Sequence, residues 1–292
     1  MKTLIDVLRN THAHWVGDGF PVRTVFSYDQ YGQELSPFLL LDYAGPHDFD
    51  AAPRPRGVGP HPHRGFETIT IVYDGEVVHR DSARSSGIIG PGDVQWMTAG
   101  AGIVHQEFHS PAFTKKGGVF RVAQLWVNLP ASHKSTPPSY QSIKAGTMPF
   151  IELPDGAGRA RVIAGSLSGK TGPAQTFTPL NVFDLDLNSG GGAPIDAPEG
   201  HTCLVIALSG VLDFDGKAQV RDAEAAVFSR DGAGVMLRPK MPTKALMLTG
   251  APIDEPIVGR GPFVMNTEAE IRQAFRDFAS GRFGGISGGA DS

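Results

Sequence analysis

The sequence predicts an all-β protein built from antiparallel barrels or sandwiches. Glycine and proline account for 37 and 23 of the 292 residues, which favours short strands joined by tight turns over long helices. Runs of β-branched and aromatic residues recur at short intervals in both halves of the chain. An apolar content of 40% with 19% charged residues describes a globular chain, long enough for one large domain or two ordinary ones.

The expected strands fall into two groups along the chain. In the first half they are residues 38–42, 68–73, 76–80 and 119–128. In the second half they are residues 182–187, 202–208, 211–214 and 245–249. Turn-forming stretches separate them, namely 74–75, 90–93, 189–192 and 209–210. This spacing is typical of an antiparallel sandwich or barrel in each half.

A linker and one helix complete the expected organisation. Residues 130–138, PASHKSTPP, have the composition of a linker, so we place two domains at residues 1–133 and 134–292. A helix is expected near residues 267–280, because Thr267 and Glu270 form a capping-box pattern. An apolar stripe then follows at helical spacing: Ile271, Ala274, Phe275 and Phe278. The stripe predicts a helix that packs on the core.

Two short strings about forty residues apart carry the strongest functional signal. His61-Pro62-His63 and His105-Gln106-Glu107 each place two metal-binding side chains at positions i and i+2, on one face of a β-strand. Three imidazoles and a carboxylate that point into one cavity suit a borderline divalent metal, of which Fe(II) is the expected one. Four protein ligands on a six-coordinate ion leave positions open for a substrate or dioxygen.

Glu67 is an alternative carboxylate ligand, because it follows His63 by four residues. It shares a face with His63 only if the strand runs without interruption, and Gly65 can host a bulge. The interpretation we favour places Glu67 outside the ligands, where it orients an imidazole N–H or a turn.

The remaining histidines and aromatic residues have less specific interpretations. His79 and His109 are expected at the surface or in hydrogen bonds, whereas His12 and His14 are not expected to bind a metal because no partner pair accompanies them. Three aromatic residues are expected to line the barrel core: Phe66, Trp96 and Phe108.

The two halves also resemble a diverged repeat, with an offset of about 134 residues. At this offset four positions can be compared: His61 and His63 correspond to Ile195 and Ala197, and His105 and Glu107 fall near Pro239 and Met241. The second half has one histidine beyond residue 133, His201, and no cysteine pair. We therefore expect two barrels, of which only the first binds a metal.

Composition excludes several classes of function. A net charge of −4 gives no basic surface for direct nucleic-acid binding. The single cysteine, Cys203, excludes an intramolecular disulfide and is expected to be a buried, inert thiol. The first sixteen residues lack the apolar segment of a signal peptide, and no stretch is long enough to span a bilayer. We therefore expect a cytoplasmic protein without a membrane partner.

At these motifs the chain resembles the pirins, a branch of the cupin superfamily. The strings that carry the resemblance are PHPHRGFETITIVYDGEVVHRDS (60–82), GPGDVQWMTAGAGIVHQEF (90–108), QLWVNLP (124–130), PPSYQ (137–141) and GRGPFVMNTEAEIRQAF (259–275). The resemblance implies a bicupin of two jelly-roll barrels, with a C-terminal segment that packs back on the first. It also implies an iron site made by His61, His63, His105 and Glu107, which favours Glu107 over Glu67, and a second barrel without a metal.

For the activity, the resemblance implies two alternatives. Some pirins are similar to quercetin 2,3-dioxygenases, which open the heterocyclic ring of a flavonol with dioxygen and release carbon monoxide. Others are non-catalytic, redox-responsive regulators that bind a transcription factor or a metabolic enzyme. Our leading hypothesis is the iron-dependent dioxygenase, in which Glu107 is the base that takes the proton of the flavonol 3-hydroxyl. Other divalent transition metals are compatible with the same ligands.

Overall fold

The computed structural model describes residues 1–9 and 12–286 and confirms the all-β class. The chain forms two compact units, and each takes in segments from beyond the boundary placed between residues 133 and 134. We call residues 12–33, 38–145 and 253–292 the N-terminal barrel, and residues 1–11, 34–37 and 146–252 the C-terminal barrel.

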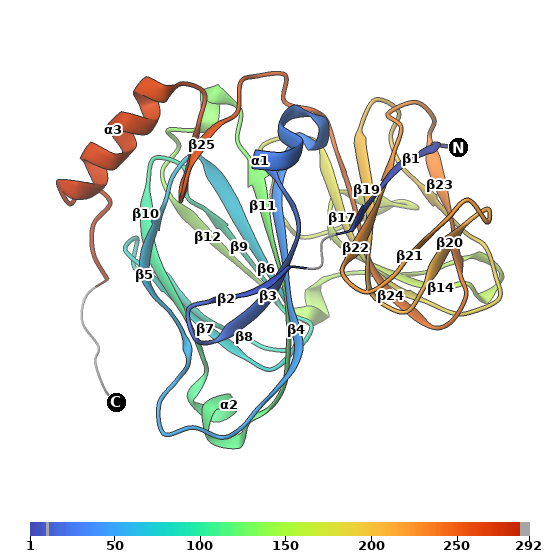
Figure 1. Ribbon diagram of the computed structural model, residues 1–292, viewed down its shortest axis with the longest axis horizontal. Helices are drawn as coiled ribbons and strands as arrows, with labels where there is room; N and C mark the ends of the chain where they lie inside the picture. The colour runs from blue at the N-terminus through green and yellow to red at the C-terminus, as the bar shows by residue number, and fades with distance from the viewer. Residues whose placement is uncertain (10–11, 287–292) are drawn as a thin grey trace. The chain divides into compact units, whose positions relative to one another are not determined.

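The N-terminal barrel has two antiparallel sheets (Figure 1). The larger, in spatial order, contains β12 (Ser139–Ile143), β9 (Val94–Thr98), β6 (Phe66–Asp74), β11 (Gly118–Asn128), β4 (Phe38–Phe49), β3 (Phe20–Ser27) and β2 (Ala13–Val16). The smaller contains β5 (Gly57–His63), β10 (Ile103–His109), β7 (Val77–Asp81) and β8 (Ser86–Ile89). The central strand β6 is buried along all but its last residue, as its β-branched sequence predicts.

The turn between β6 and β7 falls at the expected pair Asp74-Gly75. Gly75 has a φ of +82°, and a Cβ there would lie 2.6 Å from the ring of Phe120. Only glycine combines this backbone conformation with this close approach. The turn therefore fixes how strand β6 connects the two sheets of the barrel.

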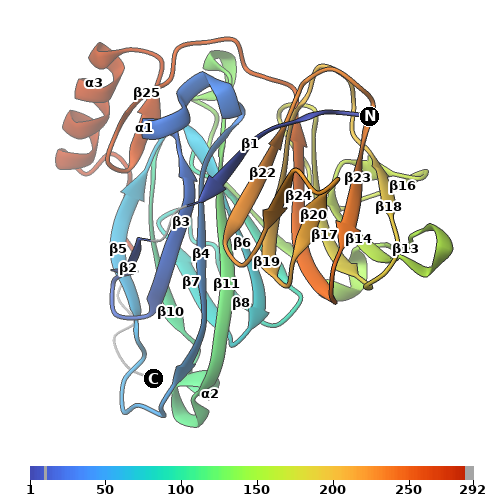
Figure 2. The same cartoon turned by 45° about the vertical axis from the view of Figure 1, so that its right-hand side comes forward.

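The C-terminal barrel repeats the same plan (Figure 2). Its larger sheet contains β1 (Leu4–Arg9), β22 (Glu224–Phe228), β19 (Thr202–Ser209), β24 (Thr243–Gly250), β17 (Leu180–Leu187), β14 (Gly158–Ala164) and β13 (Phe150–Glu152). Its smaller sheet contains β18 (Ala193–Asp196), β23 (Gly234–Pro239), β20 (Leu212–Phe214) and β21 (Ala218–Val220). The short strands β15 (Ser166–Leu167) and β16 (Lys170–Thr171) pair separately.

One edge strand of each larger sheet crosses the expected domain boundary or pairs with a strand far along the chain. Strand β1, at the start of the chain, pairs with β22 of the C-terminal barrel. Strand β12, which follows the expected linker, pairs with β9 of the N-terminal barrel. Neither exchange was anticipated from the local sequence pattern.

Three α-helices and four short 3₁₀ turns occur in the described residues. The α-helices are α1 (Tyr28–Tyr31), α2 (Pro111–Lys116) and α3 (Glu268–Ala279). The 3₁₀ turns are Gly32–Leu35, Ala131–His133, Ala145–Thr147 and Pro154–Gly156. None of the helices in this part of the chain has the length and apolar character needed to cross a membrane.

Helix α3 confirms the expected helix. The Thr267 hydroxyl accepts from Glu270 N at 3.2 Å, which satisfies one of the free N–H groups of the first turn. Ile271 and Ala274 are fully buried, whereas Phe275 and Phe278 lie at the edge of the stripe and are about 40% exposed. The helix follows the hairpin of β25 (Val258–Arg260) and β26 (Phe263–Met265).

The C-terminal segment packs back on the N-terminal barrel, as the resemblance implies. Val264 N of β26 donates to Arg64 O at 3.0 Å, and the Arg64 guanidinium pairs with Asp277 of α3 at 2.7 Å. The buried Lys134 ammonium donates to Gly65 O at 2.8 Å and to Val264 O at 2.9 Å. The end of the chain therefore fixes the residues directly after the first histidine pair.

Candidate metal centre

The two predicted ligand strings lie on neighbouring strands. β5 carries His61 and His63, β10 carries His105 and Glu107, and the two strands pair antiparallel. His61 lies directly across from His105, and the register shifts between His105 and Glu107. Because side chains alternate between the faces of a strand, this pairing directs both strings to one side of the sheet.

Three imidazoles converge at this place. The ring centroids of His61 and His105 are 4.2 Å apart, and that of His63 lies 4.9 Å from each of them. One nitrogen from each ring lies within 4.8 Å of the others, so the three can share a metal ion. His63 and His105 are buried and His61 is half-buried, which leaves the cluster accessible from one side.

Two ring nitrogens of this cluster fit a metal ion. His63 Nδ1 and His105 Nε2 are buried, and neither has a hydrogen-bond partner among the described residues. Buried polar atoms are nearly always satisfied, and each of these two converging rings leaves one nitrogen without a partner, as a bound group would require. His61 Nδ1 lies 2.9 Å from Gly59 O; if it donates there, Nε2 is the nitrogen left to bind.

The electrostatics of the cluster also suit metal binding. Burial lowers the pKa of His63 well below its usual value, and the neighbouring His61 lowers it further. Burial likewise lowers the pKa of His105, helped by the three other histidines around it. Both rings are therefore neutral at neutral pH, which is the form that binds a metal.

Glu107 is buried and held by amides. Its Oε1 accepts from Gln95 Nε2 at 2.7 Å and from Thr70 Oγ1 at 3.3 Å, while its Oε2 accepts from Gln124 Nε2 at 3.3 Å. Glu107 forms a second potential metal cluster with His79 and His105, so His105 is common to both clusters. The carboxylate lies beside the three-histidine cluster rather than equally close to all three rings.

The alternative carboxylate, Glu67, belongs to neither cluster among the described residues. It is buried in β6 and accepts from Thr98 Oγ1 at 2.8 Å. Burial raises its pKa to about 7. Glu67 therefore connects β6 to β9 through its hydrogen bond with Thr98.

His79 is hydrogen-bonded, which agrees with one of its two interpretations, but its place beside His105 was not expected. It is fully buried; its Nε2 lies 3.0 Å from Asp81 Oδ2, and its Nδ1 lies 3.4 Å from His105 Nδ1. The signal that could have revealed it is the i, i+2 pair His79 and Asp81, the same spacing as in the two ligand strings. His109 is hydrogen-bonded, as one of its interpretations held: its Nε2 donates to Gly19 O at 2.9 Å.

Two aromatic rings lie next to His63. The centroids of Phe66 and Trp126 are each 5.2 Å from the His63 ring and 4.3 Å from each other. Phe66 and Trp96 are buried in the core as expected, and Trp126 is half-buried. Trp126 could not be singled out from the sequence, because its place beside His63 depends on the pairing of β11 with β6.

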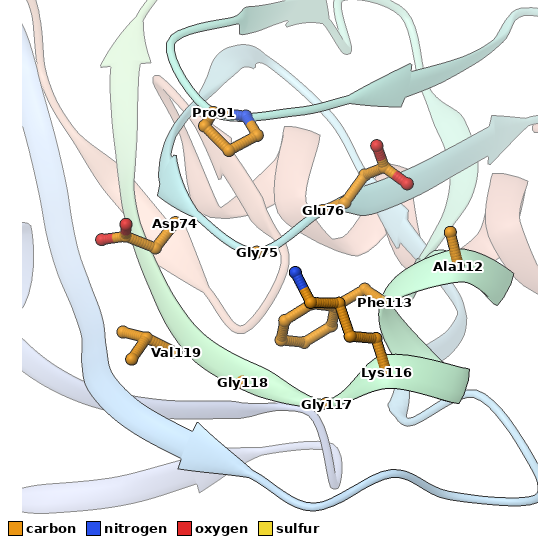
Figure 3. Close-up of a pocket in the computed structure, with 10 residues that line it drawn as sticks. All are labelled: Asp74, Gly75, Glu76, Pro91, Ala112, Phe113, Lys116, Gly117, Gly118 and Val119. Carbon is orange, nitrogen blue, oxygen red and sulfur yellow. The ribbon is translucent and has the colours of Figure 1, made fainter.

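A separate cleft of about 390 Å³ lies at the Asp74 end of β6 (Figure 3). Its walls include Glu76, Phe113 and Lys116, and none of the candidate ligands lines it. The cleft therefore does not belong to the histidine cluster.

The chain has two antiparallel barrels, and one of them contains histidines and a carboxylate that could hold a metal ion. These features define a two-domain cupin protein. The sequence profile of Pirin matches residues 19–127, and that of the Pirin C-terminal cupin domain matches residues 182–284. This chain belongs to the pirin family.

Three similar proteins place the chain within this family. A Pseudomonas aeruginosa protein named "Putative quercetin 2,3-dioxygenase" is 53% identical over 283 residues, covering 97% of this chain and 99% of its own. The crystal structure of a quercetin 2,3-dioxygenase from Acinetobacter baumannii is 52% identical and has a TM-score of 0.95, covering 98% of this chain and 99% of its own. Human pirin is 36% identical over 258 residues, covering 86% of this chain and 84% of its own.

Proposed function

We propose that this protein is an iron-dependent quercetin 2,3-dioxygenase, which opens the heterocyclic ring of a flavonol with dioxygen and releases carbon monoxide. The observation that carries the proposal is the buried cluster of His61, His63 and His105 beside Glu107, with two unsatisfied imidazole nitrogens. The likeness to the Acinetobacter baumannii enzyme along nearly the whole chain supports it.

His61, His63, His105 and Glu107 would hold the metal. Three nitrogens and one carboxylate oxygen suit Fe(II), and they also accept other divalent transition metals. When bound, the ion supplies Lewis-acid activation of the substrate hydroxyl and a redox partner for dioxygen. Under this proposal the metal centre catalyses the dioxygenase reaction and does not act only as a redox sensor.

Glu107 is the proposed base for the 3-hydroxyl of the flavonol. Gln95 makes the short hydrogen bond, at 2.7 Å, to Oε1, whereas Oε2 has only the longer contact of 3.3 Å with Gln124. Oε2 is therefore the oxygen better placed to take a proton. Gln95 and Gln124 keep the carboxylate in place during this transfer, since each amide donates to a different oxygen.

Trp126, which packs on the buried ring of Phe66, is suited to position the substrate. Flavonol rings are planar and aromatic, and offset or edge-to-face contacts with such rings are favourable. His61, Gln124 and Trp126 are all half-buried, so each keeps some surface that a substrate can contact. A flavonol that enters here would meet Trp126 and His61, which are both half-buried.

The test is turnover by the iron-loaded protein, purified without oxygen and then mixed with quercetin and air. We expect oxygen uptake, loss of the visible absorbance of quercetin, and one carbon monoxide per flavonol consumed. The metal-free protein is the matched control. An iron-replete protein that consumes no flavonol would contradict the proposal and leave the regulatory alternative.

A further inference from the structure

A buried chain of three side chains lies behind one of the candidate ligands. Asp81 Oδ2 lies 3.0 Å from His79 Nε2, and His79 Nδ1 lies 3.4 Å from His105 Nδ1. The Asp81, His79 and His105 side chains are all buried. Strands β7 and β10 bring the three together, since Asp81 lies across from His105 in their pairing.

The direction of each hydrogen bond follows from the chemistry of its atoms. A carboxylate oxygen only accepts, so His79 Nε2 donates to Asp81. In a neutral imidazole the other nitrogen then accepts, so His79 Nδ1 accepts from His105 Nδ1. His105 carries its proton on Nδ1 in this arrangement, and its Nε2 keeps a free lone pair. This is the nitrogen that is buried without a partner.

We propose that Asp81 and His79 are positioning residues, which fix His105 in the tautomer that presents Nε2 to the metal. The proposal rests on the metal centre described under the proposed function, but not on turnover. It also explains the cluster of His79, His105 and Glu107. His79 uses one ring nitrogen for Asp81 and the other for His105, so it is not itself a ligand. Partners of this kind orient a metal-binding imidazole and raise its basicity.

Two further contacts hold the chain in place. Asp81 Oδ1 accepts from Ser85 N at 2.9 Å, which fixes the carboxylate so that Oδ2 faces His79. Tyr140 stacks on the His79 ring, with centroids 4.8 Å apart and planes 19° apart, so the ring keeps its orientation. The order of donors and acceptors is therefore set from Ser85 through to His105.

The substitution Asp81→Asn reverses this order with little change in shape. Its amide oxygen would stay with Ser85 N, so its NH₂ group would face His79 Nε2. His79 Nε2 would then accept and Nδ1 would donate, which makes His105 Nδ1 an acceptor. The proton of His105 would move to Nε2 and block metal binding there.

His79→Asn is the second variant, because it separates tautomer control from folding. Its amide can turn its oxygen toward His105 Nδ1 and so keep the binding tautomer. The shorter side chain loses the bond to Asp81 and leaves a cavity, so it destabilises the fold more than Asp81→Asn does. The two variants should therefore rank in opposite orders for metal affinity and for thermal stability.

The experiment measures the affinity for Ni²⁺ and for Fe²⁺, each alone, by competition with a chelator, together with thermal unfolding of the metal-free proteins. We expect Asp81→Asn to weaken binding about 10–100-fold and His79→Asn by less, although His79→Asn melts at the lower temperature. An Asp81→Asn affinity within twofold of wild type would overturn the proposal. So would affinity losses that follow the stability losses.

A second readout reports the tautomer directly. In the metal-free protein, long-range ¹H–¹⁵N correlation spectra show which ring nitrogen of His105 carries the proton. We expect Nδ1 in wild type and Nε2 in Asp81→Asn; the same nitrogen in both would overturn the proposal. Wild-type protein that binds metal but does not turn over flavonol would contradict only the catalytic proposal.

Discussion

The two barrels share one strand plan but differ in what fills the same place. In the N-terminal barrel His61 of β5 pairs with His105 of β10, whereas in the C-terminal barrel Ile195 of β18 pairs with Val235 of β23. The first pair belongs to a polar cluster and the second to a continuous apolar core. The difference shows that a few inward positions, and not the sheets, decide what chemistry such a barrel can support.

The central strands show the same contrast. Glu67 is the second residue of β6, and Cys203 is the second residue of β19. Burial raises the pKa of Glu67 to about 7 and that of Cys203 to about 12. At this position the N-terminal barrel therefore has a carboxyl group, Glu67, with a pKa near 7, whereas the thiol of Cys203 in the C-terminal barrel stays protonated.

The largest expected effect is loss of the metal from His63→Ala. We expect about one metal equivalent per chain in wild type and less than about a tenth in the variant, because an imidazole ligand is removed. The matched control is His201→Ala in the C-terminal barrel, which should keep the full equivalent. Elemental analysis measures both. A full equivalent in His63→Ala would refute the site, and two equivalents in wild type would refute a metal-free second barrel.

Glu107→Gln should slow flavonol turnover by about 10²–10⁴-fold, because it keeps the size of the side chain but removes the base. Rates are compared per bound iron, so that partial loss of metal does not enter the comparison. No substitution in the apolar core of the C-terminal barrel should match this loss. A variant as fast as wild type at full iron occupancy would exclude Glu107 as the base.

Leu237→Ala tests the opposite property in the C-terminal barrel. Leu237 is fully buried in the apolar core, so the cavity should lower the free energy of unfolding by about 2–5 kcal/mol. Metal content in the folded protein should not change. Denaturant unfolding and elemental analysis give the two values; a loss of metal from the folded variant would show that the barrels are not independent in this respect.

Glu67→Gln gives the smallest expected effect, and it depends on pH. The pKa of Glu67 is higher in the folded protein, at about 7, than the usual value of 4.5, so its contribution to stability is full below pH 4.5 and is lost as pH rises through about 7. The loss is at most about 3 kcal/mol in wild type and should be absent in Glu67→Gln. Cys203→Ser should leave the pH profile between 4 and 8 unchanged. Equal pH profiles for wild type and Glu67→Gln, from denaturant unfolding, would contradict the raised pKa.

Much of the fold could be predicted because the signals are local. The expected run 68–73 lies within β6, 202–208 within β19, and the capping box marks the start of α3. The two candidate ligand strings could be found in the sequence because two side chains at i and i+2 already define a face of a strand. The placement of β1 and β12 could not be predicted, since an edge strand is chosen by a partner far along the chain.

Contacts between residues on different strands were the other feature that could not be predicted from the sequence. Gln95 and Gln124 are ordinary residues in the sequence and acquire a role only where β9 and β11 bring them to Glu107. The constant offset of about 134 residues between the halves is also wrong for the second ligand string, His105 and Glu107. The residue that pairs with Ile195 is Val235, not Pro239, and Met241 is 48% exposed beyond β23. The segment between the paired strands is four residues shorter in the second barrel, as 105 − 61 = 44 against 235 − 195 = 40.

The exchange of terminal segments sets the order in which the protein can be completed during its synthesis. Strand β1 is made well before its partner, because Arg9 pairs with Glu224, which is 215 residues later in the chain. At about 5–20 residues per second the ribosome needs on the order of 10–40 s to reach that partner. Val264, which fixes the segment after the first histidine pair, is made later still. The segment after the first histidine pair can therefore reach its full set of contacts only once Val264 has been made.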